Sequence, residues 1–128
     1  MTPNSLERPL RLGLLYLALV VAWNAGGLVQ IARGLPAPGP VASPQVIAFS
    51  LASAAGLFAG ARRWPVLFAG LCLVMVVAAA PSVGKIFTLD PALWPSDAWR
   101  YAGAAVNATG VVAGAWGMAA WVRLRWGA

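Results

Sequence analysis

Long apolar runs separated by short polar breaks predict four membrane-spanning helices. Four runs carry no charged side chain, and they cover residues 12–32, 43–61, 65–84 and 101–122. A helix rises 1.5 Å per residue, so about 20 residues cross the roughly 30 Å of hydrocarbon in a bilayer. Each run is close to that length. We therefore expect an all-α fold, a four-helix transmembrane bundle in up-down order with consecutive helices antiparallel.

Proline marks the breaks between these runs. Segment 35–40 holds three prolines, which remove backbone donors and clash with the preceding turn, so no helix continues through it. Ser43 followed by Pro44 is typical of an N-cap and the first helical position. Pro65 indicates another helix start directly after Arg62 and Arg63. The second and third helices are therefore expected to be joined by a tight turn.

The third break, residues 85–100, is the longest. We predict that the preceding helix ends at Gly84, because Pro81 shortly before that point is more typical of a terminus than of a kink. Asp90-Pro91 and Ser96-Asp97 each have the pattern of a helix start. Two interpretations stay open for this external segment: a short helix lying in the membrane interface, or a loop anchored by tryptophans.

Basic residues at the edges of the runs predict the orientation. One side of the membrane would hold six of them, namely Arg8, Arg11, Arg62, Arg63, Arg123 and Arg125, and the other would hold Arg33, Lys85 and Arg100. Loops rich in arginine and lysine stay in the cytoplasm. We therefore expect a multi-pass protein of a bacterial-type inner membrane with both termini cytoplasmic.

Composition supports a membrane protein and narrows the possible chemistry. Apolar residues make up 61% of the 128 residues and charged residues 9%, against about 25% charged in soluble domains. The net charge of +6 is spread along the chain rather than gathered in a patch, so we expect no nucleic-acid partner. The chain has no histidine, one cysteine and three acidic residues, all three outside the runs. We therefore expect no metal site, no cofactor and no catalytic residues.

A stripe of small residues predicts a helix-packing face. Because these residues are three or four positions apart, they lie on one side of the fourth helix. Small side chains there let a neighbouring helix approach closely. The second helix carries a shorter stripe of the same kind. The sequence leaves open whether these faces pack within the bundle or between protomers. The stripes comprise Gly103, Asn107, Gly110, Gly114, Gly117 and Trp121 in the fourth helix, and Ala52, Gly56 and Gly60 in the second.

A few polar side chains inside the runs are candidates for a binding pocket. With both termini inside, Asn24, Ser50, Asn107 and Thr109 would lie in the outer half of the bilayer. Asn24 and Asn107 differ in depth by about one turn, so they would meet if the first and fourth helices are neighbours. One interpretation is a polar pocket open to the outside. The other is interhelical hydrogen bonding worth about 0.6 kcal/mol per bond.

Three functional hypotheses follow. The first is a non-catalytic accessory subunit that packs against itself as a homo-oligomer or against a larger membrane protein. The second is a small oligomeric transporter or channel for a neutral or weakly polar solute. The third is a lipid- or quinone-linked enzyme, for which Asp90 and Asp97 are the only acids near one interface. In size and topology the chain resembles the small multidrug resistance transporters, but residues 19–24 lack the glutamate that those proteins carry in their first helix.

Overall fold

The computed structural model describes residues 3–127, which form helices and no strands. Within that range four α-helices are long and apolar enough to cross a membrane, which confirms the number of predicted spans. The molecule is consistent with a small multi-pass membrane protein. The elements are η1 (Pro3–Leu6), α1 (Glu7–Ala32), α2 (Pro44–Arg63), α3 (Pro65–Thr88), η2 (Pro91–Leu93) and α4 (Asp97–Trp126), where η denotes a short 3-10 turn.

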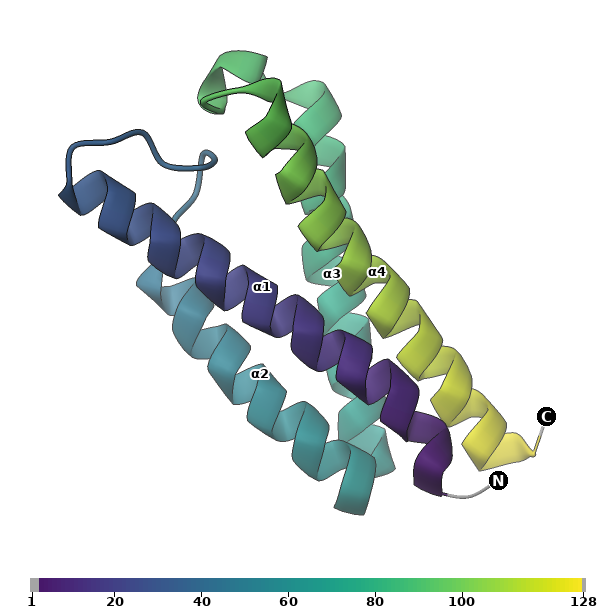
Figure 1. Cartoon of the computed structure of the whole chain (residues 1–128). Helices are drawn as coiled ribbons and strands as arrows, with labels where there is room; N and C mark the ends of the chain where they lie inside the picture. Colours follow the sequence, from purple (N-terminus) through teal and green to yellow (C-terminus); the bar gives the residue numbers. More distant parts are fainter. Residues whose placement is uncertain (1–2, 128) are drawn as a thin grey trace.

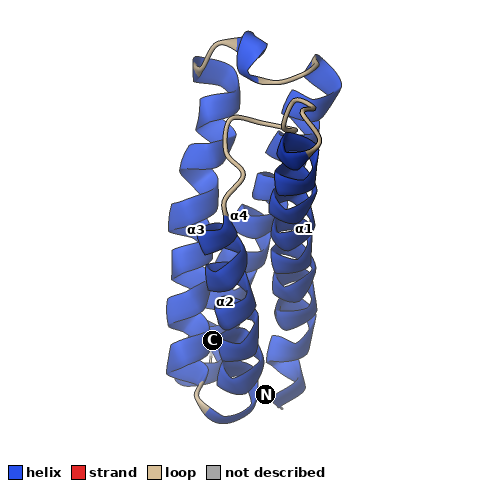
Figure 2. Cartoon of the chain, turned by 90° about the vertical axis from the view of Figure 1, so that its left-hand side faces the viewer, coloured by secondary structure: helices blue, strands red, loops and turns tan. Residues whose placement is uncertain are grey.

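The four helices form two hairpins. Figure 1 shows α1 beside α2 and α3 beside α4, with both chain termini at one end of the molecule. The hairpins diverge toward the opposite end, where segments 33–43 and 89–96 connect the helices. Figure 2 shows segment 33–43 running down along the bundle before α2 begins, so α2 stops short of that end.

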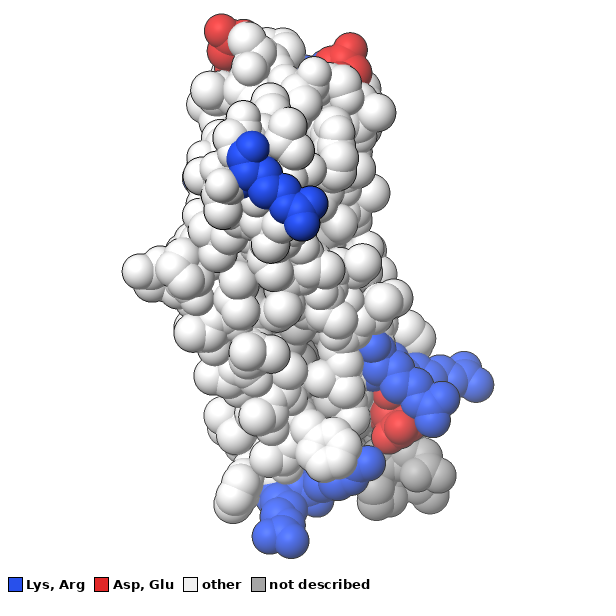
Figure 3. Space-filling view, turned by 60° about the vertical axis from the view of Figure 1, so that its left-hand side comes forward, with Lys and Arg blue, Asp and Glu red and all other residues white. Residues whose placement is uncertain are grey.

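Charged side chains lie toward the two ends of the molecule. Figure 3 shows them gathered there, with uncharged surface between them on the face in view. The exposed side chains in the helices include large apolar ones such as Leu51, Val66 and Val77, which are 58%, 73% and 63% exposed. A soluble protein rarely exposes so much apolar surface, whereas lipid covers it at no cost.

The N-caps predicted from the sequence are confirmed, although α1 begins at Glu7 and α4 at Asp97, each before the start of its predicted run. The Ser43 hydroxyl accepts a hydrogen bond from the Val46 N–H at 3.4 Å, and the Ser96 hydroxyl accepts one from the Trp99 N–H at 3.4 Å. The Asp90 carboxylate accepts from the Ala92 N–H at 2.9 Å and so caps η2. Each side chain satisfies one of the N–H groups that a helix start leaves without an intrahelical partner.

The predicted end of the third helix was wrong. α3 continues through Pro81 and past Gly84 to Thr88, and Asp90-Pro91 stops it instead. Proline removes a single N–H from the ladder, and a membrane helix tolerates that loss when side chains bond to nearby carbonyls. The Ser82 hydroxyl donates to the Ala78 carbonyl at 3.2 Å, next to the Val77 carbonyl that Pro81 leaves without its donor. The connection is consequently only residues 89–96, and η2 is its only helical turn, which favours the loop over the interfacial helix.

The hydrophobic core occupies the half of the molecule nearer the termini. Its members come from the start of α1, the end of α2, the start of α3 and the end of α4. Phe68 and Leu57 are the most enclosed of its large side chains in these helices, at 0% and 1% exposure. The opposite half, where the hairpins diverge, is not filled in this way. The buried members in α1–α4 are Leu10, Tyr16, Leu17, Leu57, Phe68, Cys72, Met75, Ala79, Ala113 and Ala120.

Candidate functional site

A cavity of about 340 Å³ lies between the two hairpins in the half away from the termini. This volume falls in the range of about 300–1,000 Å³ that is typical of small-molecule sites. Side chains from all four helices and both connections at that end contribute to its wall. They are Tyr16, Val20, Trp23, Asn24, Gly39, Pro40, Val41, Val46, Ala78, Ser82, Lys85, Ile86, Trp94, Gly103, Val106 and Asn107.

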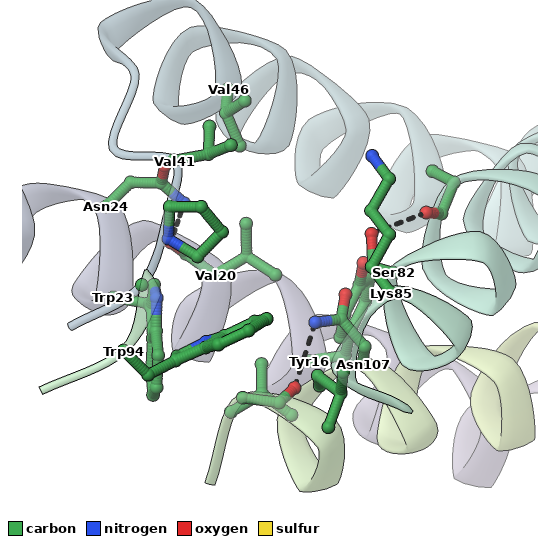
Figure 4. A pocket seen from close by; sticks show the side chains of 16 residues that line it. Tyr16, Val20, Trp23, Asn24, Val41, Val46, Ser82, Lys85, Trp94 and Asn107 are labelled. Atoms are coloured by element: carbon green, nitrogen blue, oxygen red, sulfur yellow. Dashed lines mark hydrogen bonds between the residues drawn. The ribbon is translucent and has the colours of Figure 1, made fainter. Parts of the chain in front are cut away.

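Two indole rings form one side of the cavity. Figure 4 shows Trp23 of α1 and Trp94 of segment 89–96 next to each other. Trp23 is held by an edge-to-face contact with Trp99, with ring centroids 5.6 Å apart. Trp94 is 7% exposed and lies against Gly39, where an added Cβ would come within 3.2 Å of the indole Nε1. Glycine at this position therefore lets segments 33–43 and 89–96 close over the cavity together.

Polar side chains form the opposite side. In Figure 4, Ser82, Lys85 and Asn107 lie across the cavity from the two indoles. The Asn107 amide nitrogen donates to the Gly103 carbonyl at 2.9 Å, and the Ser82 hydroxyl is bonded to its own helix. Within residues 3–127 neither ion pair includes Lys85, which is the only charged residue in the cavity wall. The cavity thus has an aromatic side and a cationic, amide-bearing side.

Asn24 has a structural part in this arrangement. Its amide nitrogen donates to the Val20 carbonyl at 2.9 Å, and its oxygen accepts from the backbone N–H of Ser43 at 3.0 Å. The residue is 6% exposed. The second bond spans from α1 to the N-cap of α2 and therefore fixes where segment 33–43 ends. Although it lines the cavity, Asn24 already uses both ends of its amide.

The structure separates the four residues that the sequence grouped as a polar pocket. Asn24 and Asn107 line one cavity, but no hydrogen bond joins them within the part of the chain described. Ser50 is buried in α2 at 3% exposure and does not line the cavity. Thr109 is also outside the wall, and its hydroxyl donates to the Ala105 carbonyl at 2.9 Å. The polar side of the cavity is completed by Ser82 and Lys85 instead.

The glycine stripe of α4 contacts helices of the same chain. A Cβ on Gly103 or Gly110 would meet the rings of Trp23 and Tyr16 in α1. Gly114 and Gly117 face Cys72 of α3 so closely that an added Cβ would overlap it. The stripe therefore brings α4 into contact with α1 and α3 within the protomer, and the exposed surface of α4 lies elsewhere.

Only part of the shorter stripe of α2 packs against a neighbouring helix. Gly60 lies against the backbone of Phe68, where an added Cβ would be 2.7 Å from the amide nitrogen, and Gly56 lies against Leu71. Ala52 is exposed and takes no part in this contact. Gly60 thus closes the tight α2–α3 turn at the end of the molecule near the termini.

Sequence reasoning missed several residues of the cavity wall. Lys85 was placed in a connection because the third helix was predicted to end at Gly84, and the extension of α3 moves it into the wall. Trp94 was interpreted as one of several interfacial anchors, but it is buried. Tyr16 and Trp23 gave no signal, because an aromatic residue in an apolar run has the same pattern whether it faces lipid or a cavity.

The acidic residues are engaged in local contacts. Asp97 forms an ion pair with Arg100 at 3.0 Å, and the Arg100 guanidinium also donates to the Ile86 carbonyl at 3.3 Å, which joins α4 to α3. Among the residues described, no group of three or more His, Cys, Asp or Glu side chains lies close enough to hold a metal ion. No protein-family model matches the chain, and no curated protein and no solved structure is significantly similar to it.

Proposed function

We propose that this protein is a small membrane transporter whose cavity receives an amphipathic solute from the outer face of the membrane. The observation that carries the proposal is the cavity itself, with indole rings on one side and polar side chains on the other. An amphipathic molecule has the same division, so each of its parts meets matching surface. In a chain that packs its other half tightly, an open cavity lined by four helices favours binding of a solute.

The proposal includes an up-down topology with both termini in the cytoplasm of an inner membrane. The end with the termini carries six of the nine basic residues, and both Asp90 and Asp97 lie at the other end. The positive-inside rule then places the cavity in the outer half of the bilayer. Segments 33–43 and 89–96 lie at the outer end of the cavity, and a solute would enter between them.

The two hairpins provide a mechanism for moving the solute. At the closed end glycines lie where the hairpins meet: Gly110 of α4 faces Tyr16 of α1, and Gly60 of α2 faces Phe68 of α3. These glycines present no side chain to the facing hairpin, so they are the points about which one hairpin could tilt on the other. Tilting that closes the outer cavity and opens the inner end is the usual form of alternating access.

The accessory-subunit hypothesis has less support than the sequence indicated. It rested on glycine faces that would bind a partner, and the buried glycines of α4 contact α1 and α3 of the same chain. The enzyme hypothesis rested on Asp90 and Asp97, which serve as a cap and as an ion-pair partner. Either role stays a hypothesis, and co-purification of a partner protein without measurable solute flux would favour the accessory role.

Cysteine accessibility tests whether the cavity is open to water from outside. In a Cys72→Ser background, Val106→Cys places a thiol in the cavity wall, and Val112→Cys places one on the exposed surface of the same helix. A membrane-impermeant methanethiosulfonate should modify Val106→Cys from the outer face and leave Val112→Cys, which lies in lipid, unmodified. Equal reactivity of both thiols, or none, would contradict an outward-facing cavity.

Flux through reconstituted vesicles tests transport. Three tracers with one aromatic ring and different heads serve as probes: benzenesulfonate, benzyltrimethylammonium and phenyl glucoside. Wild-type protein should accelerate uptake of at least one of them over protein-free vesicles. Ala78→Phe, which adds a ring to the cavity wall, should abolish that uptake, whereas Ala80→Phe, in the same helix but outside the wall, should not. If wild type and Ala78→Phe give the same flux for every probe, the transporter proposal is wrong.

A further inference from the structure

We propose that the cavity selects a small amphipathic anion, and that Lys85 is the residue that binds its charged head. This inference rests on the proposed function, because it specifies which solute the cavity receives. Lys85 is the only charged residue in the cavity wall, so no acidic residue lines the cavity. The protein therefore offers its ligand a net positive site in a mostly apolar surrounding.

Each acidic residue of the chain makes a contact with a group other than Lys85. Glu7 pairs with Arg11 at 3.1 Å near the N-terminus, and Asp97 pairs with Arg100 at 3.0 Å. Asp90 is used as the cap of η2. These three are all the acidic residues of the sequence. A cation near the hydrocarbon region requires a counter-charge or water. Lys85 is exposed and pairs with none of the three acidic residues, so water or an anion from outside the chain serves it.

Asn107 adds a second donor on the same side as Lys85. Its amide nitrogen has two hydrogens, and the bond to the Gly103 carbonyl uses one of them. The other can donate to a ligand in the cavity that both residues line. Val46 in the first turn of α2 also lines the cavity, so the partial positive charge at the start of that helix also favours an anion there.

The rest of the wall fits an apolar body of limited size. Trp23 and Trp94 face the polar side across the cavity, and Val20 and Val106 add aliphatic surface. A flat ring or a short alkyl chain would stack against the indoles while its head reached Lys85. An aromatic or short-chain sulfonate, carboxylate or phosphate ester has this form. The headgroup of an anionic lipid has the same chemistry at its charged end.

The decisive comparison uses two probes of nearly the same shape. Benzenesulfonate is an anion and benzenesulfonamide is neutral, so a difference between them reports charge. Binding of each radiolabelled probe is measured by equilibrium dialysis against the full-length protein in phosphatidylcholine nanodiscs. We expect wild type to bind the sulfonate about tenfold more tightly than the sulfonamide, as a charge-assisted hydrogen bond provides.

Variants then assign the effect to Lys85. Lys85→Gln should weaken sulfonate binding about tenfold and leave sulfonamide binding unchanged, and Lys85→Arg should restore the sulfonate preference. The matched control is Arg33→Gln, which removes one positive charge at the same end of the molecule but outside the cavity wall. If Arg33→Gln weakens binding as much as Lys85→Gln, the assignment to Lys85 is overturned.

Two further measurements distinguish a lipid headgroup from a soluble anion, and a failure of the anion proposal from a failure of the cavity proposal. Anionic phosphatidylglycerol in the nanodisc should compete with benzenesulfonate if a lipid headgroup is the natural occupant, and should have no effect if a soluble solute is. Both results support an anionic ligand. If both probes bind equally well to wild type but not to Ala78→Phe, the cavity proposal stands and the anion proposal fails. If Ala78→Phe binds both probes like wild type, the cavity proposal itself fails.

Discussion

At the scale of single residues, the environment of each glycine decides what a methyl group would do there. Gly114 faces the carbonyl oxygen of Cys72, and an added Cβ would lie only 2.5 Å from it. Gly70, in the neighbouring helix α3, has no atom within 4 Å of the same ideal Cβ position. The two positions look alike in the sequence, since both are glycines within apolar runs. Only their neighbours in space distinguish them.

Alanine substitution should therefore have opposite effects at these glycines. Gly114→Ala should destabilise the protein by about 1–3 kcal/mol, because the α3 backbone must move away. Gly70→Ala should leave stability unchanged or raise it by up to about 1 kcal/mol, because alanine favours the helix and meets no neighbour. Unfolding by SDS in mixed micelles measures both. A Gly114→Ala protein as stable as wild type would show that α3 and α4 do not touch there.

At the scale of elements, side chains outside the apolar pattern decide where helices begin and end. α3 passes through Pro81 and ends before Asp90-Pro91, which places Lys85 in the cavity wall. α2 begins where Asn24 of α1 holds the Ser43 N–H. Both boundaries position the cavity wall, so a shift of one turn in either helix would change its lining.

Removing the Asn24 side chain should loosen the start of α2. In Asn24→Ala the Ser43 N–H loses its acceptor, and a hydrogen bond of about 1 kcal/mol corresponds to several-fold faster exchange with solvent deuterium. Amide hydrogen exchange followed by NMR reports this at Ser43 and along segment 33–43. Asn107→Ala is the control, because the Asn107 amide bonds within its own helix. Unchanged protection of Ser43 in Asn24→Ala would contradict the proposed tie between α1 and α2.

At the scale of the whole molecule, the core and the cavity occupy opposite halves. Large core residues such as Phe68, Leu57 and Met75 fill the space between hairpins near the termini. Away from the termini the hairpins diverge, and the rings of Tyr16, Trp23 and Trp94 line the cavity between them. A molecule built in this way is closely packed at one end and open at the other, which suits binding from a single side of the membrane.

Impermeant labelling tests the orientation that the proposal requires. In a Cys72→Ser background, Asp90→Cys should react with a membrane-impermeant maleimide added to intact cells, and Arg63→Cys should react only after the membrane is opened. The reason is that basic connections are retained in the cytoplasm, while segment 89–96 carries Asp90 and no basic side chain. The reverse pattern would place the cavity on the cytoplasmic side.

The sequence by itself determined the number of helices, their approximate bounds and most of their caps. A backbone in hydrocarbon must satisfy its own hydrogen bonds, so uncharged runs of about 20 residues leave no alternative to helices. Ser43, Ser96 and Asp90 were predictable as caps because capping depends on residues adjacent in the chain. The ion pair between Asp97 and Arg100 was predictable for the same reason.

Only the tertiary structure decided which side chains share the cavity. Trp23 lies far in the sequence from Lys85 and Trp94, and their meeting depends on the angle between the hairpins and on the extension of α3 past Pro81. Ser50 and Thr109 have the same polar character and the same predicted depth, yet they do not line the cavity. In lipid an apolar residue has no preference between a helix neighbour and the membrane, so the sequence pattern does not record which way a helix face turns.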